Sequence, residues 1–205
     1  MEQREAERGF VVDIQELNRR AVRQSVEIVS SAREEQWDLP TPCAQWNLRQ
    51  LLAHMTAQNN GFAAAADGET EDDSVWREQP TADPGGDYLR SAERVISAFD
   101  GPDVMGREFW LPEIRRVGGF PARMAISFHF LDYVVHGWDV GAALGAPPKF
   151  DDDIVEAALE VTRRAVPVGP SRSLPGSPFA PPLPAEGSDQ DRLLRLLGRS
   201  PAWPA

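Results

Sequence analysis

Apolar residues recur every three or four positions along most of this chain, a spacing that predicts helices rather than strands. The first such segment spans residues 13–35, where Asp13 is suited to cap the start of the helix. Charged side chains separate its apolar positions, which are Leu17, Ala21, Ile28 and Val29. The two prolines within residues 37–43 then stop any helix that reaches them.

Two further helices are predicted in the first half of the chain. Asn47 can cap a second helix that runs to about Ala66, where an Asp-Gly pair ends it. Residues 69–84 are acidic and then rich in proline, so they are predicted to form a loop. A third helix is predicted over residues 87–99, and its buried stripe consists of Leu89, Ala92, Val95, Ile96 and Phe99.

The longest predicted helix lies in the second half of the chain. Pro121 fits its first position, because a residue there needs no backbone N–H, and the helix can continue to Leu144. The preceding residues 107–120 are expected to contain a short extended piece. A fifth helix opens at the acidic run 151–153, whose charge favours a helix N-terminus, and it stops near Val166.

Prolines dominate the segment that follows. Residues 167–184 contain seven prolines in 18 positions, which excludes a regular helix and a central strand. We expect residues 167–188 to form an ordered wrap or a lid, since Phe179 and Leu183 are apolar enough to dock on the protein. A short closing helix over residues 189–197 completes an all-α fold without internal repeats.

The composition is that of a globular protein. Hydrophobic residues make up 41 % of the 205 positions, so the chain can bury a core as one domain over residues 1–205. A net charge of −11 argues against a nucleic-acid partner, since phosphate binding requires a cationic surface. No apolar run approaches the ~18 residues of a membrane span, and no signal peptide opens the chain. We therefore expect no membrane partner and a cytoplasmic location.

The chain contains a single cysteine, Cys43. This excludes an internal disulfide and a cysteine-rich zinc site. No histidine or cationic cluster lies next to Cys43 in the sequence to lower its pKa. A small buried role is therefore expected for it rather than that of a nucleophile.

Candidate chemistry is concentrated in residues 129–139. Two of the three histidines of the chain, His129 and His136, fall there, and Asp132 precedes His136 by four positions. On a helix this spacing puts the carboxylate and the imidazole on one face, where both can reach one metal ion. The remaining histidine, His54, lies in another predicted helix. Two close ligands and a distant one are typical of catalytic metal sites, which keep a position open for water or substrate.

Two more residues of this segment are candidates for the same site. His129 lies on the same helix face as Asp132 and His136, so it is a candidate fourth ligand, catalytic acid–base group or pocket wall. Asp139 follows His136 by three positions and can hold the ligand imidazole through a hydrogen bond, or bond a neighbouring element instead. For each histidine the alternative interpretation is a hydrogen-bonded core residue without a metal.

Three separated motifs, taken in order, resemble a known family. They are Trp37-x-x-Pro-Thr-Pro-Cys43-x-x-Trp46-x-x-x-x-Leu51-x-x-His54, then His136-Gly-Trp-Asp139, and the tail Leu193-Leu-Arg-Leu-Leu-Gly-Arg199-x-Pro201-x-Trp203. This order is similar to that of the actinobacterial metal-binding branch of the DinB-like / mycothiol-dependent maleylpyruvate isomerase superfamily. The similarity covers nearly the whole chain.

The resemblance implies an up-and-down four-helix bundle with a divalent metal between its second and last core helices. It puts the ligands at His54, Asp132 and His136, although relatives often carry histidine or glutamate at the position of Asp132. Zinc is the expected ion, with nickel and iron as alternatives, and a mycothiol-type thiol is the implied cofactor. Maleylpyruvate itself is not the expected substrate, because the separate C-terminal domain of the isomerase has no counterpart in this sequence.

Three functions are compatible with this interpretation. The first is a metal-dependent enzyme that activates a low-molecular-weight thiol or water for isomerisation or thiol transfer on a small-molecule substrate. The second is a thiol-independent metal-dependent isomerase, cyclase or hydrolase. The third is a non-catalytic metal- or ligand-binding stress protein. A homodimer is compatible with all three, since helical bundles with exposed apolar edges often pair.

Overall fold

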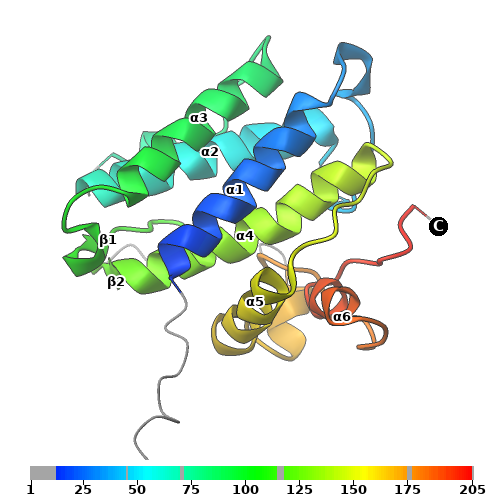
Figure 1. Ribbon diagram of the computed structural model, residues 1–205. Helices are drawn as coiled ribbons and strands as arrows, with labels where there is room; N and C mark the ends of the chain where they lie inside the picture. The colour runs from blue at the N-terminus through cyan, green and yellow to red at the C-terminus, as the bar shows by residue number, and fades with distance from the viewer. Residues whose placement is uncertain (1–12, 45, 70–71, 115–117, 175–176, 205) are drawn as a thin grey trace, which may run out of the picture.

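Four long helices lie side by side in the computed structural model of the chain (Figure 1). They are α1 (Ile14–Ser30), α2 (Leu48–Asp67), α3 (Pro84–Phe99) and α4 (Ala122–Ala143). The structure describes residues 13–44, 46–69, 72–114, 118–174 and 177–204. The predicted all-α bundle is confirmed.

The four helices point both ways along the bundle. α1 and α4 run in one direction and α2 and α3 in the other, as the colours of Figure 1 show. Two helices therefore point each way. Their order along the chain is up, down, down, up, so the directions do not alternate strictly. The connection between α2 and α3 therefore returns along the bundle, and its short helix η3 (Asp73–Trp76) packs on α2. α1 packs mainly on α4, and α2 mainly on α3.

Helix starts follow the capping residues. The side chain of Asp13 accepts hydrogen bonds from backbone N–H groups in the first turn of α1, and Asn47 does the same for α2. α3 begins earlier than predicted, because Asp83 caps it and Pro84 occupies its first position. α1 ends at Ser30, before residue 35, since the chain turns there into the short helix η2 (Glu34–Gln36).

A two-stranded ladder precedes α4 and confirms the extended piece expected within residues 107–120. β1 (Glu108–Phe109) pairs antiparallel with β2 (Phe120–Pro121). Pro121 belongs to this ladder, so it stands just before the helix and α4 begins one residue later than predicted. The ladder thus sets the point at which the longest helix enters the bundle.

α4 is the central helix of the protein. It contacts α1, α2 and α5 (Asp152–Ala165), and 16 of its 22 residues are buried. The polar side chains of His129, His136 and Asp139 are among these, so they must find hydrogen-bond partners inside the protein. Although α4 is apolar, none of the described helices is long and apolar enough to cross a membrane.

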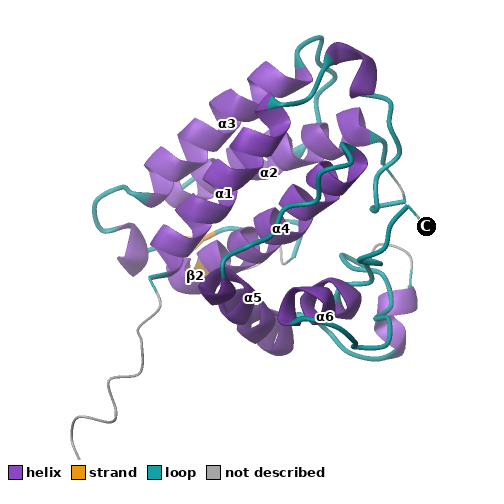
Figure 2. Cartoon of the chain, turned by 45° about the vertical axis from the view of Figure 1, so that its right-hand side comes forward, coloured by secondary structure: helices purple, strands orange, loops and turns teal. Residues whose placement is uncertain are grey.

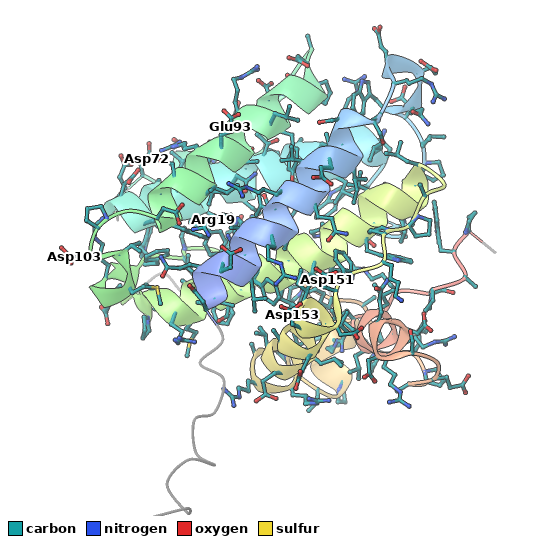
Figure 3. The ribbon with its side chains drawn as sticks, viewed as in Figure 1. Arg19, Asp72, Glu93, Asp103, Asp151 and Asp153 are labelled. Atoms are coloured by element: carbon teal, nitrogen blue, oxygen red, sulfur yellow. The ribbon has the colours of Figure 1, made fainter. Side chains whose placement is uncertain are left out.

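A second helical layer lies beside the bundle (Figure 2). It consists of α5 and α6 (Asp189–Leu196), which contact each other, while α5 also contacts α4. Arg20 of α1 binds Asp151 and Asp153 at the start of α5, each with a nitrogen–oxygen distance of 2.6 Å. Figure 3 labels these two aspartates at the start of α5, beside the bundle. The acidic run predicted to open α5 therefore also ties the layer to α1.

The proline-rich segment 167–188, which precedes α6 in the chain, packs along that helix through its described residues. Arg172, in the short helix η5 (Pro170–Ser173), is buried and donates to the carbonyl oxygens of Leu196, over 2.6 Å, and Ala180. Phe179 packs against the core as expected. Leu183 instead leaves 36 % of its surface exposed and is held by its backbone N–H, which donates to Arg195. These contacts agree with an ordered wrap, whereas closure as a lid stays a prediction.

Candidate metal centre

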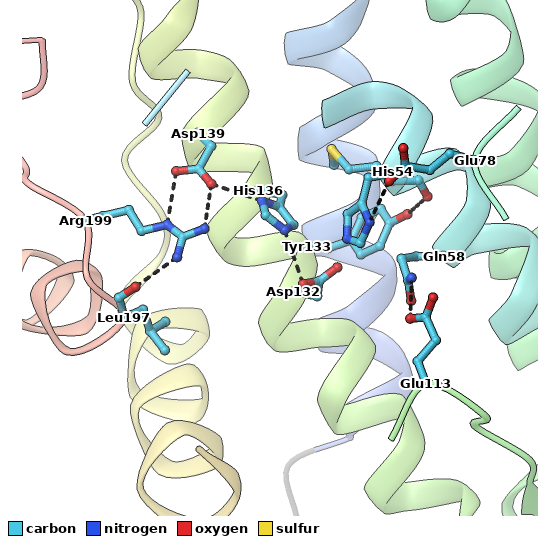
Figure 4. Close-up of polar contacts among 11 residues, drawn as sticks. His54, Gln58, Glu78, Glu113, Asp132, Tyr133, His136, Asp139, Leu197 and Arg199 are labelled. Carbon is cyan, nitrogen blue, oxygen red and sulfur yellow. Dashed lines mark hydrogen bonds and ion pairs between the residues drawn. The ribbon is translucent and has the colours of Figure 1, made fainter. Parts of the chain in front are cut away.

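Three candidate ligands meet between α2 and α4 (Figure 4). His54 projects from the first half of α2, and Asp132 and His136 project one turn apart from α4. One nitrogen or carboxylate oxygen of each residue lies within 4.8 Å of those of the other two. The structure thus brings together the three residues that the sequence predicts as metal ligands.

The donor atoms and their spacing fit a divalent metal ion. His136 Nε2 lies 3.4 Å from Asp132 Oδ1. Bonds of about 2.1 Å in a tetrahedral site place neighbouring ligand atoms roughly 3.4 Å apart. Two imidazoles and one carboxylate suit zinc, nickel or iron. A tetrahedral ion held by these three side chains keeps one position for an outside ligand.

The cluster is open to solvent on one side. The side chains of His54 and Asp132 are 21 % and 25 % exposed, whereas that of His136 is only 6 % exposed. Trp46 covers another side, because its indole stacks on the imidazole of His54 with ring centroids 4.4 Å apart. An outside ligand would therefore approach past His54 and Asp132.

A buried hydrogen bond to Asp139 fixes the orientation of His136. Its Nδ1 lies 3.0 Å from Asp139 Oδ2. Since a carboxylate only accepts hydrogen bonds, Nδ1 carries the proton and Nε2 keeps a lone pair for a ligand. Burial would raise the pKa of Asp139, but the positive charge of Arg199 and the bond from His136 outweigh it and hold that pKa below its usual value. Asp139 thus remains a charged acceptor.

His54 stays neutral at physiological pH. Burial lowers its pKa to about 4, although the negative charge of Asp132 opposes this effect. A neutral imidazole is the form that binds a metal. Glu78 Oε1 lies 3.6 Å from His54 Nδ1, too far for a hydrogen bond but close enough to attract a proton on that nitrogen. The sequence predicts only a loop at Glu78 and carries no signal for this contact.

His129 lies deeper in the bundle than the three candidate ligands. It shares their side of α4, but it precedes His136 by two turns, a rise of about 10 Å. Its ring is fully buried and stacks on Tyr133, and its two nitrogens contact the amides of Asn18 and Asn59 at 2.7 and 3.2 Å. Burial lowers its pKa to about 3. Both ring nitrogens of His129 therefore face amide groups. Neither is free for the acid–base role that the sequence suggests.

Arg199 lies at the candidate site, next to Asp139. Its position in the sequence alone does not identify it as a site residue. Its place in the tail motif is the signal that could have drawn attention to it. In the fold its guanidinium lies 3.0 Å from Asp139 and within electrostatic reach of Cys43. The expectation that no cation lies near Cys43 therefore holds along the sequence but not in space.

Comparisons with known proteins show the family of this chain. The sequence profile of the mycothiol maleylpyruvate isomerase N-terminal domain matches residues 18–141, which include the three candidate ligands and Asp139. Two uncharacterised proteins of Mycobacterium tuberculosis, from strains CDC 1551 / Oshkosh and H37Rv, are each 30 % identical to this chain over 180 residues. The alignment covers 84 % of this chain and 90 % of each relative. No solved structure matches the chain significantly. The chain belongs to the mycothiol maleylpyruvate isomerase N-terminal domain family, within the DinB-like superfamily.

Proposed function

We propose that this protein is an enzyme that holds a divalent metal ion, preferably zinc, through His54, Asp132 and His136. The ion would act on a low-molecular-weight thiol of the mycothiol type, or on water, for isomerisation or thiol transfer on a small molecule. The observation that carries this proposal is the approach of the three donor atoms to within 4.8 Å at a solvent-accessible point. The family description, which names mycothiol, supports the thiol.

The residues of the site would prepare it for an anionic ligand. A bound divalent ion lowers the pKa of a coordinated thiol or water and so supplies a nucleophile near neutral pH. Two neutral imidazoles and one carboxylate leave such a site with a net charge of about +1, which favours a thiolate. Asp139 keeps the proton of His136 on Nδ1, and Trp46 shields one side of His54 from water.

Elemental analysis of the purified protein tests the metal site. We expect one equivalent of zinc, nickel or iron in the parent protein, and none in His54→Ala or His136→Ala. Glu93→Ala, at an exposed position of α3, is the matched control and should keep the ion (Figure 3). Circular dichroism shows whether the variants remain folded. A parent protein that is metal-free and cannot be loaded would contradict the proposal.

Thermal unfolding with mycothiol tests the thiol. A ligand that binds only the native state raises the melting temperature as its concentration increases. We expect this increase for the metal-loaded protein and not for His136→Ala. If mycothiol does not shift the melting temperature of the metal-loaded protein, the thiol is not a ligand. The thiol-independent reaction, with water or a carbonyl substrate at the open position, would then replace it.

A further inference from the structure

A cleft distinct from the ligand cluster lies between α2, α3 and the connection that joins them. Its volume is about 510 Å³, which is in the size range of small-molecule sites. Small residues of α2, Ala53 and Ala57, leave room on one wall. The polar residues of the other walls are contributed by α3 and by the connection.

The lining of the cleft is rich in arginine. Arg77, Arg90 and Arg94 all line it, against the single carboxylate of Asp87. This is unexpected in a chain with 21 basic and 32 acidic residues. Guanidinium groups recognise carboxylates and phosphates through paired, charge-assisted hydrogen bonds. The charge of this lining therefore favours an anionic ligand.

Arg94 is the arginine whose charge is available to such a ligand. Arg77 and Arg90 each bind an aspartate, Asp73 and Asp87 respectively. Among the described residues, Arg94 forms no ion pair with a carboxylate, and its Nη1 donates to the side-chain oxygen of Asn60 over 3.3 Å. That bond uses one of the five N–H donors of the guanidinium. The other four remain for a ligand or water.

We infer that this cleft binds a small organic oxyanion, a carboxylate or a phosphate ester, with Arg94 as its main cationic contact. The hydroxyl groups of Thr56 and Ser74 line the cleft and add neutral donors. The methyl groups of Ala53 and Ala57 give the carbon skeleton of the ligand an apolar surface. The site does not depend on a metal ion.

Residues 77–79 connect the cleft to the ligand cluster. Arg77 and Gln79 line the cleft, whereas Glu78 between them faces His54. Arg77 has an extended backbone, in which successive side chains point to opposite sides. An anion that is bound by Arg94 and contacts this lining segment would therefore also hold Glu78 beside His54. A ligand in the cleft should therefore change the surroundings of His54 without contacting the imidazole itself.

Titration of the full-length protein with inorganic phosphate and with succinate, at constant ionic strength, tests the cleft. We expect saturable binding by calorimetry and a shift of the His54 imidazole resonances. Arg94→Gln keeps a donor for Asn60 but removes the charge, so its affinity should fall about tenfold or more. Arg23→Gln, at an exposed position of α1, is the matched control and should bind as the parent does.

A second variant makes the test independent of the folding of Arg94→Gln. Ala53→Leu obstructs the cleft without removing a charge, and it should also weaken binding. Absence of saturable binding of either anion to the parent would overturn the inference. Equal affinities in Arg94→Gln, Ala53→Leu and Arg23→Gln would overturn it too, because they would indicate unspecific association with surface arginines.

Discussion

Arg199 and Asp139 form a buried ion pair that connects the end of the chain to the helix with two of the three candidate ligands. Arg199 Nη2 and Nε lie 3.0 and 3.4 Å from the two carboxylate oxygens. The side chains are only 5 % and 0 % exposed. Because Asp139 also accepts the hydrogen bond from His136, the C-terminal segment supports the candidate site from behind.

Removal of Arg199 should destabilise the fold strongly. The variant Arg199→Met leaves the carboxylate of Asp139 buried without its partner, which costs about 3–5 kcal/mol of the free energy of unfolding. Urea unfolding followed by circular dichroism measures this loss. Arg192→Met is the matched control, since Arg192 is 54 % exposed and its surface pair contributes less than about 1 kcal/mol. Equal stabilities of the two variants would show that the buried pair contributes little.

Replacement of Asp139 should weaken metal binding without removing a ligand. Asp139→Asn can still accept a hydrogen bond from His136. It lacks the negative charge that makes the imidazole a stronger ligand for the metal ion. Loss of such a supporting group lowers metal affinity by about 10–100-fold. Competition for zinc with a chromophoric chelator measures the affinity. Asp151→Asn, at an exposed carboxylate, should bind zinc as the parent does, and the same result for Asp139→Asn would contradict the prediction.

His129 should make the stability of the protein depend on acidity. Burial lowers its pKa to about 3, whereas the unfolded chain has a value of about 6.5. Between these values the unfolded state binds more protons than the native state. The free energy of unfolding is therefore highest above pH 6.5 and decreases as the pH falls towards 3, by at most about 1.4 kcal/mol per pH unit.

The variant His129→Gln isolates this contribution from that of His54 and the carboxylates. Urea unfolding of both proteins at pH 7 and pH 4.5 gives the loss of stability for each. We expect the loss to be smaller in His129→Gln by about 2 kcal/mol, since glutamine does not titrate. The same loss in both proteins would mean that His129 is protonated in the native state.

Gly61 should be intolerant of a side chain. A Cβ atom at this position would lie 2.2 Å from the indole of Trp76, which packs directly on α2. Gly61→Ala must displace that ring and should destabilise the protein by about 1–3 kcal/mol. Gly106→Ala is the control, because no atom lies within 4 Å of its added Cβ. Thermal unfolding of the two variants compares them, and equal melting temperatures would show that Trp76 is not held at this place.

Local features of this protein could be predicted from the sequence. The side chains of Asp13 and Asn47 cap helices through neighbours only two or three residues away, so their types and positions suffice. The spacing of Asp132 and His136 likewise determines that they share one helix face. Prediction was wrong at Pro121, where the short ladder with residues 108–109 keeps the chain extended until α4 begins.

Only the tertiary structure decided which of these local features meet. The arrangement of α2 against α4 brings His54 to His136, and the second helical layer brings Arg199 to Asp139. The same packing encloses His129 among aromatic rings, although its sequence spacing from His136 suggested a place in the site. The spacing of residues in the sequence determines which face of its own helix a side chain occupies. It carries no information on depth in the bundle or on distant partners, because these depend on how whole helices bury their apolar faces together.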